Sequence, residues 1–107
     1  MTSAAQRAVF HILAAYGEDF DMIRASRSRP SRGLFAPMDG STTGIYFDSN
    51  EAVGLLRPAQ VLYTDGAQAE PPLTGDVYFR DGRLWTVRKT QVFRLSSLPI
   101  LVLSLCD

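Results

Sequence analysis

A β-hairpin is the strongest structural signal in the sequence: it runs from Val77 to Gln91 and turns at Asp81-Gly82. An Asp-Gly pair supplies the positive φ angles that a type I′ turn requires, and β-forming residues flank it on both sides. The turn also sets the register of the two strands. It predicts four cross-strand pairs: Arg80 with Arg83, Phe79 with Leu84, Tyr78 with Trp85, and Val77 with Thr86.

The predicted hairpin is apolar on both faces. One face carries Val77, Phe79 and Leu84, and the other carries Tyr78, Trp85 and Val87. An antiparallel sheet with one side in water alternates apolar and polar residues, so each face of this hairpin needs a cover. The interior of a β-barrel can cover one face. We expect the face with Tyr78, Trp85 and Val87 to contact the N-terminal helix or a neighbouring subunit.

The N-terminal segment is predicted to form a helix from about Ala4 to Tyr16. Apolar residues recur along it at helical spacing: Val9, Ile12, Leu13 and Tyr16. Thr2 or Ser3 can cap its first turn, and Gly17 is placed to end it in the left-handed conformation. We expect the helix to dock on the core of its own domain; a helix reserved for a partner is the alternative.

The rest of the chain reads as short strands separated by turn-forming residues. The predicted strands are Phe20 to Ala25, Leu34-Phe35, Val53 to Leu56, Val61 to Tyr63, and a last strand, Ile100 to Leu105, that is buried on both sides and pairs with the hairpin. Ile45 to Phe47 fits strand or loop. Loops are expected at Ser26 to Gly33 and at Asp39 to Gly44. The fold class is therefore mainly β: a small β-barrel or sandwich-like domain with one N-terminal amphipathic helix and long loops.

Length and composition limit the chain to one core. It has 107 residues, of which 46% are hydrophobic, and eleven basic residues balance eleven acidic ones. We expect a single domain, with the helix in residues 1–17 and the β-domain in residues 18–107. The apolar run Leu98 to Leu105 is far shorter than the roughly 20 residues that span a bilayer, so no membrane contact is expected.

Residues with catalytic potential are few and scattered. One histidine, His11, and one cysteine, Cys106, exclude an intrachain disulfide and leave no metal-ligand cluster of usual spacing. Carboxylates gather at residues 18–21, where a turn from helix to strand explains them as backbone-capping groups. We therefore predict no enzyme, no cofactor and no metal site, and a small hydrolase remains only a residual alternative.

Four arginines form the most distinctive charged feature. They lie within nine residues and have no acidic residue among them: Arg24, Arg27, Arg29 and Arg32. Two interpretations stay open: contact with a partner's carboxylates or a DNA backbone, and a plain solvated loop. Charges of opposite sign are also separated along the chain. The charged residues in 37–76 are mainly acidic, and those in 77–107 are mainly basic. Opposite patches on identical subunits permit head-to-side packing into a ring.

Several short motifs follow one another in a distinctive order. After the helix come Tyr16-Gly17-Glu18-Asp19, Arg32-Gly33-Leu34-Phe35-Ala36-Pro37, Leu73-Thr74-Gly75-Asp76 and the hairpin's Leu84-Trp85-Thr86-Val87. This order resembles the small head-tail joining proteins of tailed bacteriophages, also called head-closure, stopper or connector proteins. The stretch from Ser49 to Gly75 departs from that family's strand pattern, which leaves the number of strands there open.

The resemblance implies a small β-barrel-like structural protein of the virion neck, assembled in the host cytoplasm. Such a subunit forms a homo-oligomeric ring, as a hexamer or dodecamer, between the portal or adaptor protein and a tail terminator or tail tube protein. DNA passes through the ring without sequence-specific contact. The loop at residues 26–33 would then face a neighbour or the channel.

A small nucleic-acid-binding β-barrel is the alternative function. It would use the four arginines on phosphates and would stack bases on Tyr78 and Trp85.

Overall fold

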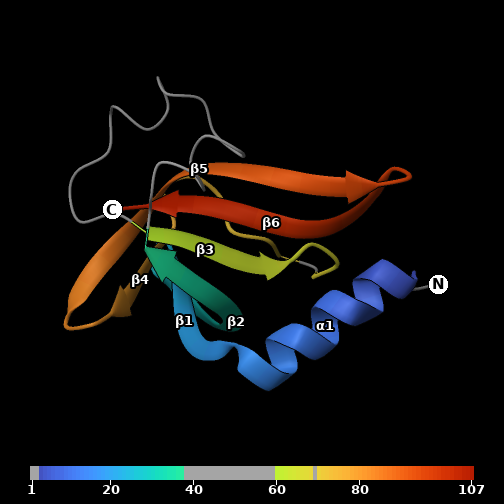
Figure 1. The fold of residues 1–107 in the computed structure, drawn as a ribbon. Coiled ribbons are helices and arrows are strands. Elements are labelled where there is room, and N and C mark those ends of the chain that lie inside the picture. Colours follow the sequence, from blue (N-terminus) through green and yellow to red (C-terminus); the bar gives the residue numbers. More distant parts are fainter. Residues whose placement is uncertain (1–2, 38–59, 69) are drawn as a thin grey trace.

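The computed structural model describes residues 3–37, 60–68 and 70–107 and contains one helix and six strands in those ranges (Figure 1). The elements are α1 (Ala4–Tyr16), β1 (Glu18–Arg24), β2 (Arg27–Pro37), β3 (Gln60–Asp65), β4 (Val77–Arg80), β5 (Arg83–Leu95) and β6 (Leu98–Cys106). The predicted loop at 39–44 and the segments at 45–47 and 53–56 lie outside the described residues. The predicted mainly β class with one N-terminal helix is confirmed.

The strands form a closed antiparallel barrel in the order β1-β2-β3-β6-β5-β4. Its seam, where β4 meets β1, is short: only Met22 pairs with Tyr78 and Ile23 with Val77. The seams that flank β6 are longer, since β6 pairs with β3 on one side and with β5 on the other. The barrel is therefore held most weakly at the β1–β4 seam.

The predicted hairpin is confirmed in its turn and its register. β4 and β5 pair Val77 with Thr86, Tyr78 with Trp85, Phe79 with Leu84 and Arg80 with Arg83. Asp81 and Gly82 have φ angles of 54° and 80°, as a type I′ turn requires.

The barrel interior takes the face of the hairpin that carries Tyr78, Trp85 and Val87. All three are buried and form one cluster with Met22, Leu62 and Cys106. The prediction that these three residues contact the helix or another subunit is wrong. Closure of the sheet covers that face, whereas Phe79 and Leu84 on the outer face are 62% and 58% exposed.

The last strand is buried on both sides, as predicted. Ser104 and Cys106 alternate along β6 with Leu103 and Leu105, and all four are buried. The two leucines form a second apolar cluster with Val61 of β3.

The helix has the predicted bounds but a different buried face. Ser3 caps it in a capping box with Gln6, whose amide Nε2 donates to the carbonyl of Pro99 at 2.9 Å. Leu13 is buried, yet Ile12 and Tyr16 of the predicted stripe are exposed. Among the described strands, the helix packs mainly on β2, β3 and β6, and it buries a narrow line of residues rather than the whole stripe.

Gly17 is extended rather than left-handed, with φ −75°, so the predicted left-handed stop is wrong. The glycine is needed for space instead, because a Cβ there would lie 2.5 Å from the carbonyl oxygen of Leu13.

The predicted arginine loop at Ser26 to Gly33 is also wrong. A tight turn at Ala25-Ser26 leads directly into β2, and Ala25 has a positive φ of 55°. Residues 27–33 then pair one by one with β1. The strand could not be predicted from these residues, because arginine, serine, proline and glycine are not the residue types that usually form strands.

A second hairpin, between β5 and β6, was not predicted. It turns at Ser96 and Ser97, which have φ angles of 50° and 69°. Serine pairs rarely take this conformation, so no turn signal marked it. Figure 1 shows β5 and β6 continuing past the end of β3. We call residues 90–98 the β5–β6 arm.

Adjacent substitutions on β5 test the assignment of the two faces. Trp85→Ala should destabilise the monomer by about 3–5 kcal/mol, because it empties a large site in the barrel core. Leu84→Ala should cost less than about 1 kcal/mol, because the side chain is already largely in water. Chemical denaturation of both variants measures this; equal losses would contradict the assignment.

Candidate functional site

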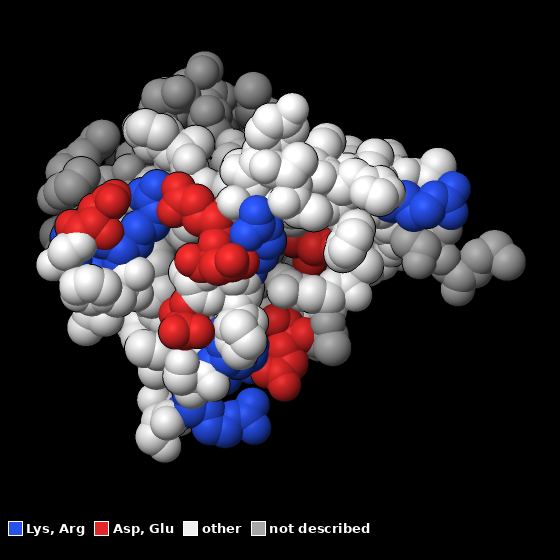
Figure 2. Space-filling model, turned by 90° about the horizontal axis from the view of Figure 1, so that it is seen from below, with Lys and Arg blue, Asp and Glu red and all other residues white. Residues whose placement is uncertain are grey.

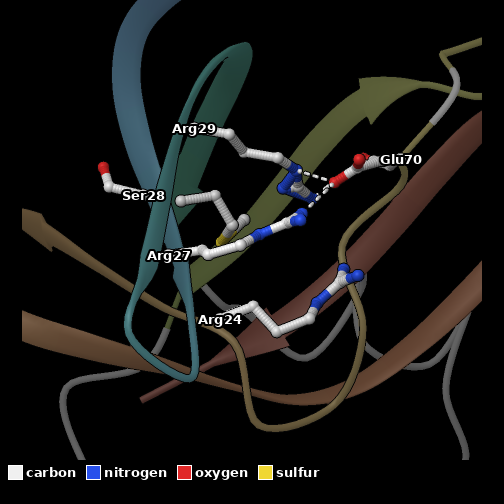
Figure 3. Close-up of a pocket in the computed structure, with 6 residues that line it drawn as sticks. Arg24, Arg27, Ser28, Arg29 and Glu70 are labelled. Atoms are coloured by element: carbon white, nitrogen blue, oxygen red, sulfur yellow. Dashed lines mark hydrogen bonds and ion pairs between the residues drawn. The ribbon is translucent and has the colours of Figure 1, made fainter.

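Three of the four arginines converge on one end of the barrel. The register of β1 and β2 pairs Arg24 with Arg27 and Met22 with Arg29, so these arginines share the face of the buried Met22. Arg32 is out of phase by one residue and lies on the other face. Figure 3 shows Arg27 and Arg29 directed toward Glu70. We call Arg24, Arg27 and Arg29 the arginine cluster.

Arg24 forms a bidentate ion pair with Asp76. Its Nε and Nη2 atoms donate to the two carboxylate oxygens, each at 2.9 Å. Asp76 also accepts a 2.9 Å hydrogen bond from the backbone N–H of Leu73. Burial opposes the charge of Asp76, whose side chain is 2% exposed, but these hydrogen bonds outweigh it and hold its pKa below the usual value.

Glu70 lies between the other two arginines. Arg29 Nε is 3.1 Å from Glu70 Oε2, and Arg27 Nη2 is 3.5 Å from the same oxygen. Arg29 Nη2 also donates to the backbone carbonyl of Glu70 at 2.8 Å. The three arginines, Glu70, Met22 and Ser28 line a pocket of about 170 Å³.

Arg32 has a structural role at the end of the helix. Its guanidinium donates to the carbonyls of Leu13 and Ala14 at 2.8 and 3.0 Å and to Asp19 at 2.8 Å. Carbonyls in the last turn of a helix lack partners within the helix, and Arg32 supplies one to Ala14. It also donates to Leu13, whose carbonyl accepts from the Gly17 N–H at 2.9 Å as well. The sequence places Arg32 in one group with the other three arginines, and this prediction is wrong: in the structure Arg32 lies on the other face of β2, at the end of the helix.

The interpretation of these arginines as a plain solvated loop is wrong, since residues 27–33 form a strand and each of the four arginines has an acidic partner. Their acidic partners come from outside the run of arginines: Asp19, Glu70 and Asp76. On the face that Figure 2 shows, acidic and basic side chains lie next to one another rather than forming a continuous basic surface. Contact of the arginine cluster with a partner or with DNA stays a prediction.

The proposed base-stacking surface is not available. Tyr78 is fully buried, and the guanidinium of Arg83 lies over the ring of Trp85 at 3.5 Å from its centroid. Trp85 Nε1 donates to the carbonyl of Arg80 at 2.9 Å, which fixes the indole in the core. The nucleic-acid-binding alternative thereby loses the aromatic residues on which it depended.

Groups that could do chemistry do not meet. His11 is exposed on α1, and Cys106 is buried in the barrel. Within the described ranges, no three histidine, cysteine or acidic residues are placed to hold a metal ion. In the same ranges, no helix is long and apolar enough to cross a membrane.

The β5–β6 arm gathers several exposed apolar side chains on one short segment of the described chain. Four of its large apolar side chains are between 37% and 47% exposed: Val92, Phe93, Leu95 and Leu98. Val92 and Phe93 are neighbours in the strand, so they lie on opposite faces. In the described part of the chain, β5 pairs only with β6 beyond Val87, which leaves one backbone edge of residues 90–95 without a paired strand.

Comparisons with family models, curated proteins and solved structures found no match for this chain. Its function must therefore be argued from the arginine cluster, the arm and the sequence motifs. Sequence reasoning found the arginines but missed the arm, because the Ser96-Ser97 turn carries no glycine or asparagine.

Replacing Asp76 tests the buried ion pair. Its pKa is lower in the folded chain, so ionised Asp76 stabilises the fold above about pH 4, and this contribution disappears as the pH falls through the folded pKa. Asp76→Asn should cost about 1–3 kcal/mol near neutral pH, with Arg24 partly in water. Urea denaturation across pH should show the two proteins converging in acid; a constant difference would contradict this role.

Thiol reactivity tests the position of Cys106. Burial raises the pKa of its thiol to about 12, so almost no thiolate is present near neutral pH. We expect iodoacetamide to modify Cys106 in urea but not in the folded protein, as followed by mass spectrometry. Modification of the folded protein at the rate of a free cysteine would show that the β6 end of the barrel is open.

Proposed function

We propose that this protein is a structural subunit of a tailed-bacteriophage neck, forming a homo-oligomeric ring between the portal or adaptor and the tail. The β5–β6 arm is the observation that carries the assembly part of this proposal. The ordered sequence motifs that resemble head-tail joining proteins supply the place in the virion. Nothing in the described site favours catalysis, because its charged groups are arranged as ion pairs within the chain.

The arm has the properties of a subunit contact. Soluble proteins usually protect strand edges with charge, proline or a covering element, because an open edge pairs with other chains. This arm instead combines an edge that no described strand pairs with apolar residues on both faces, Val92 on one and Phe93 on the other. A second copy that covers it would bury this apolar surface and pair the edge.

A second apolar surface is available on α1. Phe10, Ile12 and Tyr16 are 59%, 49% and 75% exposed, although the helix docks on the barrel. A ring needs two different surfaces on each subunit, because its contacts are heterologous. The arm of one subunit and the helix of the next are such a pair. DNA would pass through the ring without a dedicated reading site.

A charge in the arm tests the proposal. Phe93→Lys should leave the barrel folded, because the side chain lies outside it, but should weaken each subunit contact about 30- to 200-fold, or about 2–3 kcal/mol. Size-exclusion chromatography with light scattering, on protein alone and with the purified adaptor–portal complex, measures assembly. Circular dichroism checks the fold.

Phe79→Lys is the matched control, since Phe79 is also exposed but lies on the β4–β5 hairpin. We expect this variant to assemble like the wild type. Two results would contradict the proposal: a wild-type protein that remains a monomer even on the connector, or a Phe93→Lys variant that assembles normally.

A further inference from the structure

The pocket at the arginine cluster has more positive than negative charge. Three guanidinium groups line it, and among the described residues two carboxylates pair with them, Asp76 and Glu70. Asp76 accepts two hydrogen bonds from Arg24 and one from Leu73, and its Oδ2 also lies 4.0 Å from Arg29 Nη2. Glu70 is the nearer carboxylate for Arg29 and, among the described residues, the one that pairs with Arg27.

Glu70 fits this position poorly. Both arginines approach a single carboxylate oxygen, at 3.1 and 3.5 Å, and neither forms the two parallel hydrogen bonds that an arginine makes with a well-placed carboxylate. The Glu70 side chain is half exposed, so it gains hydration when it turns away from the two arginines. It occupies the pocket without satisfying the donors around it.

Unused donors remain beside Glu70. Arg29 Nη1 is buried and makes no hydrogen bond within the described part of the chain. Buried polar groups are normally hydrogen-bonded, so this nitrogen marks a place where an acceptor belongs. The Arg27 side chain is 76% exposed and is free to reorient around a ligand. Figure 3 shows the Ser28 hydroxyl directed away from the guanidinium groups, so arginines supply the side-chain donors.

We propose that the arginine cluster binds a phosphate-type oxyanion, and that Glu70 competes with this anion for Arg27 and Arg29. A phosphate group carries between one and two negative charges at neutral pH and spreads them over oxygens that point in different directions, so it can meet two guanidinium groups at once. A carboxylate such as Glu70 offers only two oxygens in one plane. This site is independent of the apolar arm and goes beyond the neck function proposed above.

Titration with inorganic phosphate tests the site. The probe is added to isotope-labelled protein at neutral pH, with chloride keeping the ionic strength constant, and amide shifts are followed by NMR. We expect saturable shifts at residues 27–29 and 70. Glu70→Gln should bind phosphate about tenfold more tightly, because it removes a competing charge. Arg27→Gln should bind about tenfold more weakly, and its exposure means that the fold is kept.

Arg94→Gln is the control for net charge, since Arg94 is exposed on the β5–β6 arm. It should bind phosphate within twofold of the wild type. The proposal is overturned if Glu70→Gln shows no saturable binding, if it binds no more tightly than the wild type, or if Arg94→Gln loses as much affinity as Arg27→Gln. It is also overturned if acetate binds as tightly as phosphate.

Competition identifies the source of the phosphate. A short DNA duplex that displaces inorganic phosphate from the Glu70→Gln protein assigns the site to a nucleic-acid backbone, whereas a duplex that leaves it bound assigns the site to a free phosphate or phosphate monoester. Either result supports the site. Phe93→Lys should bind phosphate normally, so failure of assembly and failure of anion binding are distinguishable.

Discussion

Closure of the barrel depends on the seam between β1 and β4, because only two residue pairs join these strands. Tyr78 holds the seam from the inside: its ring packs between those of Phe20, Phe35 and Trp85, and its hydroxyl donates to Gln60 Oε1 at 2.7 Å. Burial raises the pKa of this phenol, which keeps it neutral as a donor. The aromatic cluster thus supplies stability that backbone pairing alone does not.

Ion pairs secure both ends of the same seam. Arg80, at the end of β4, donates to both oxygens of Glu18 at 2.9 and 3.1 Å, and this hydrogen bonding holds the pKa of Glu18 below its usual value. Arg24, at the end of β1, grips Asp76 just before β4. Charges that look segregated along the sequence are therefore matched in space.

The sequence predicted those elements whose structure depends on residues close together in the chain. The Asp81-Gly82 turn, the bounds of α1 and the two-sided burial of β6 follow from turn chemistry, capping and apolar runs. Three features depended on the closed sheet instead: the burial of Trp85, the pairing of the arginines with distant acids, and the narrow docking line of the helix. The arm at residues 90–98 was missed because serines form its turn. The arginines of the candidate site were predictable from the sequence, but their partners Glu70 and Asp76 were not.

Hydrogen–deuterium exchange on the free monomer and on the assembled ring tests directly whether copies of this chain meet at the β5–β6 arm, as we propose. Amides of β5 that point away from β6 between residues 90 and 95 should exchange quickly in the monomer and slowly in the ring, because a neighbouring chain then covers that edge. Unchanged exchange in these residues, with new protection only elsewhere, would contradict the claim.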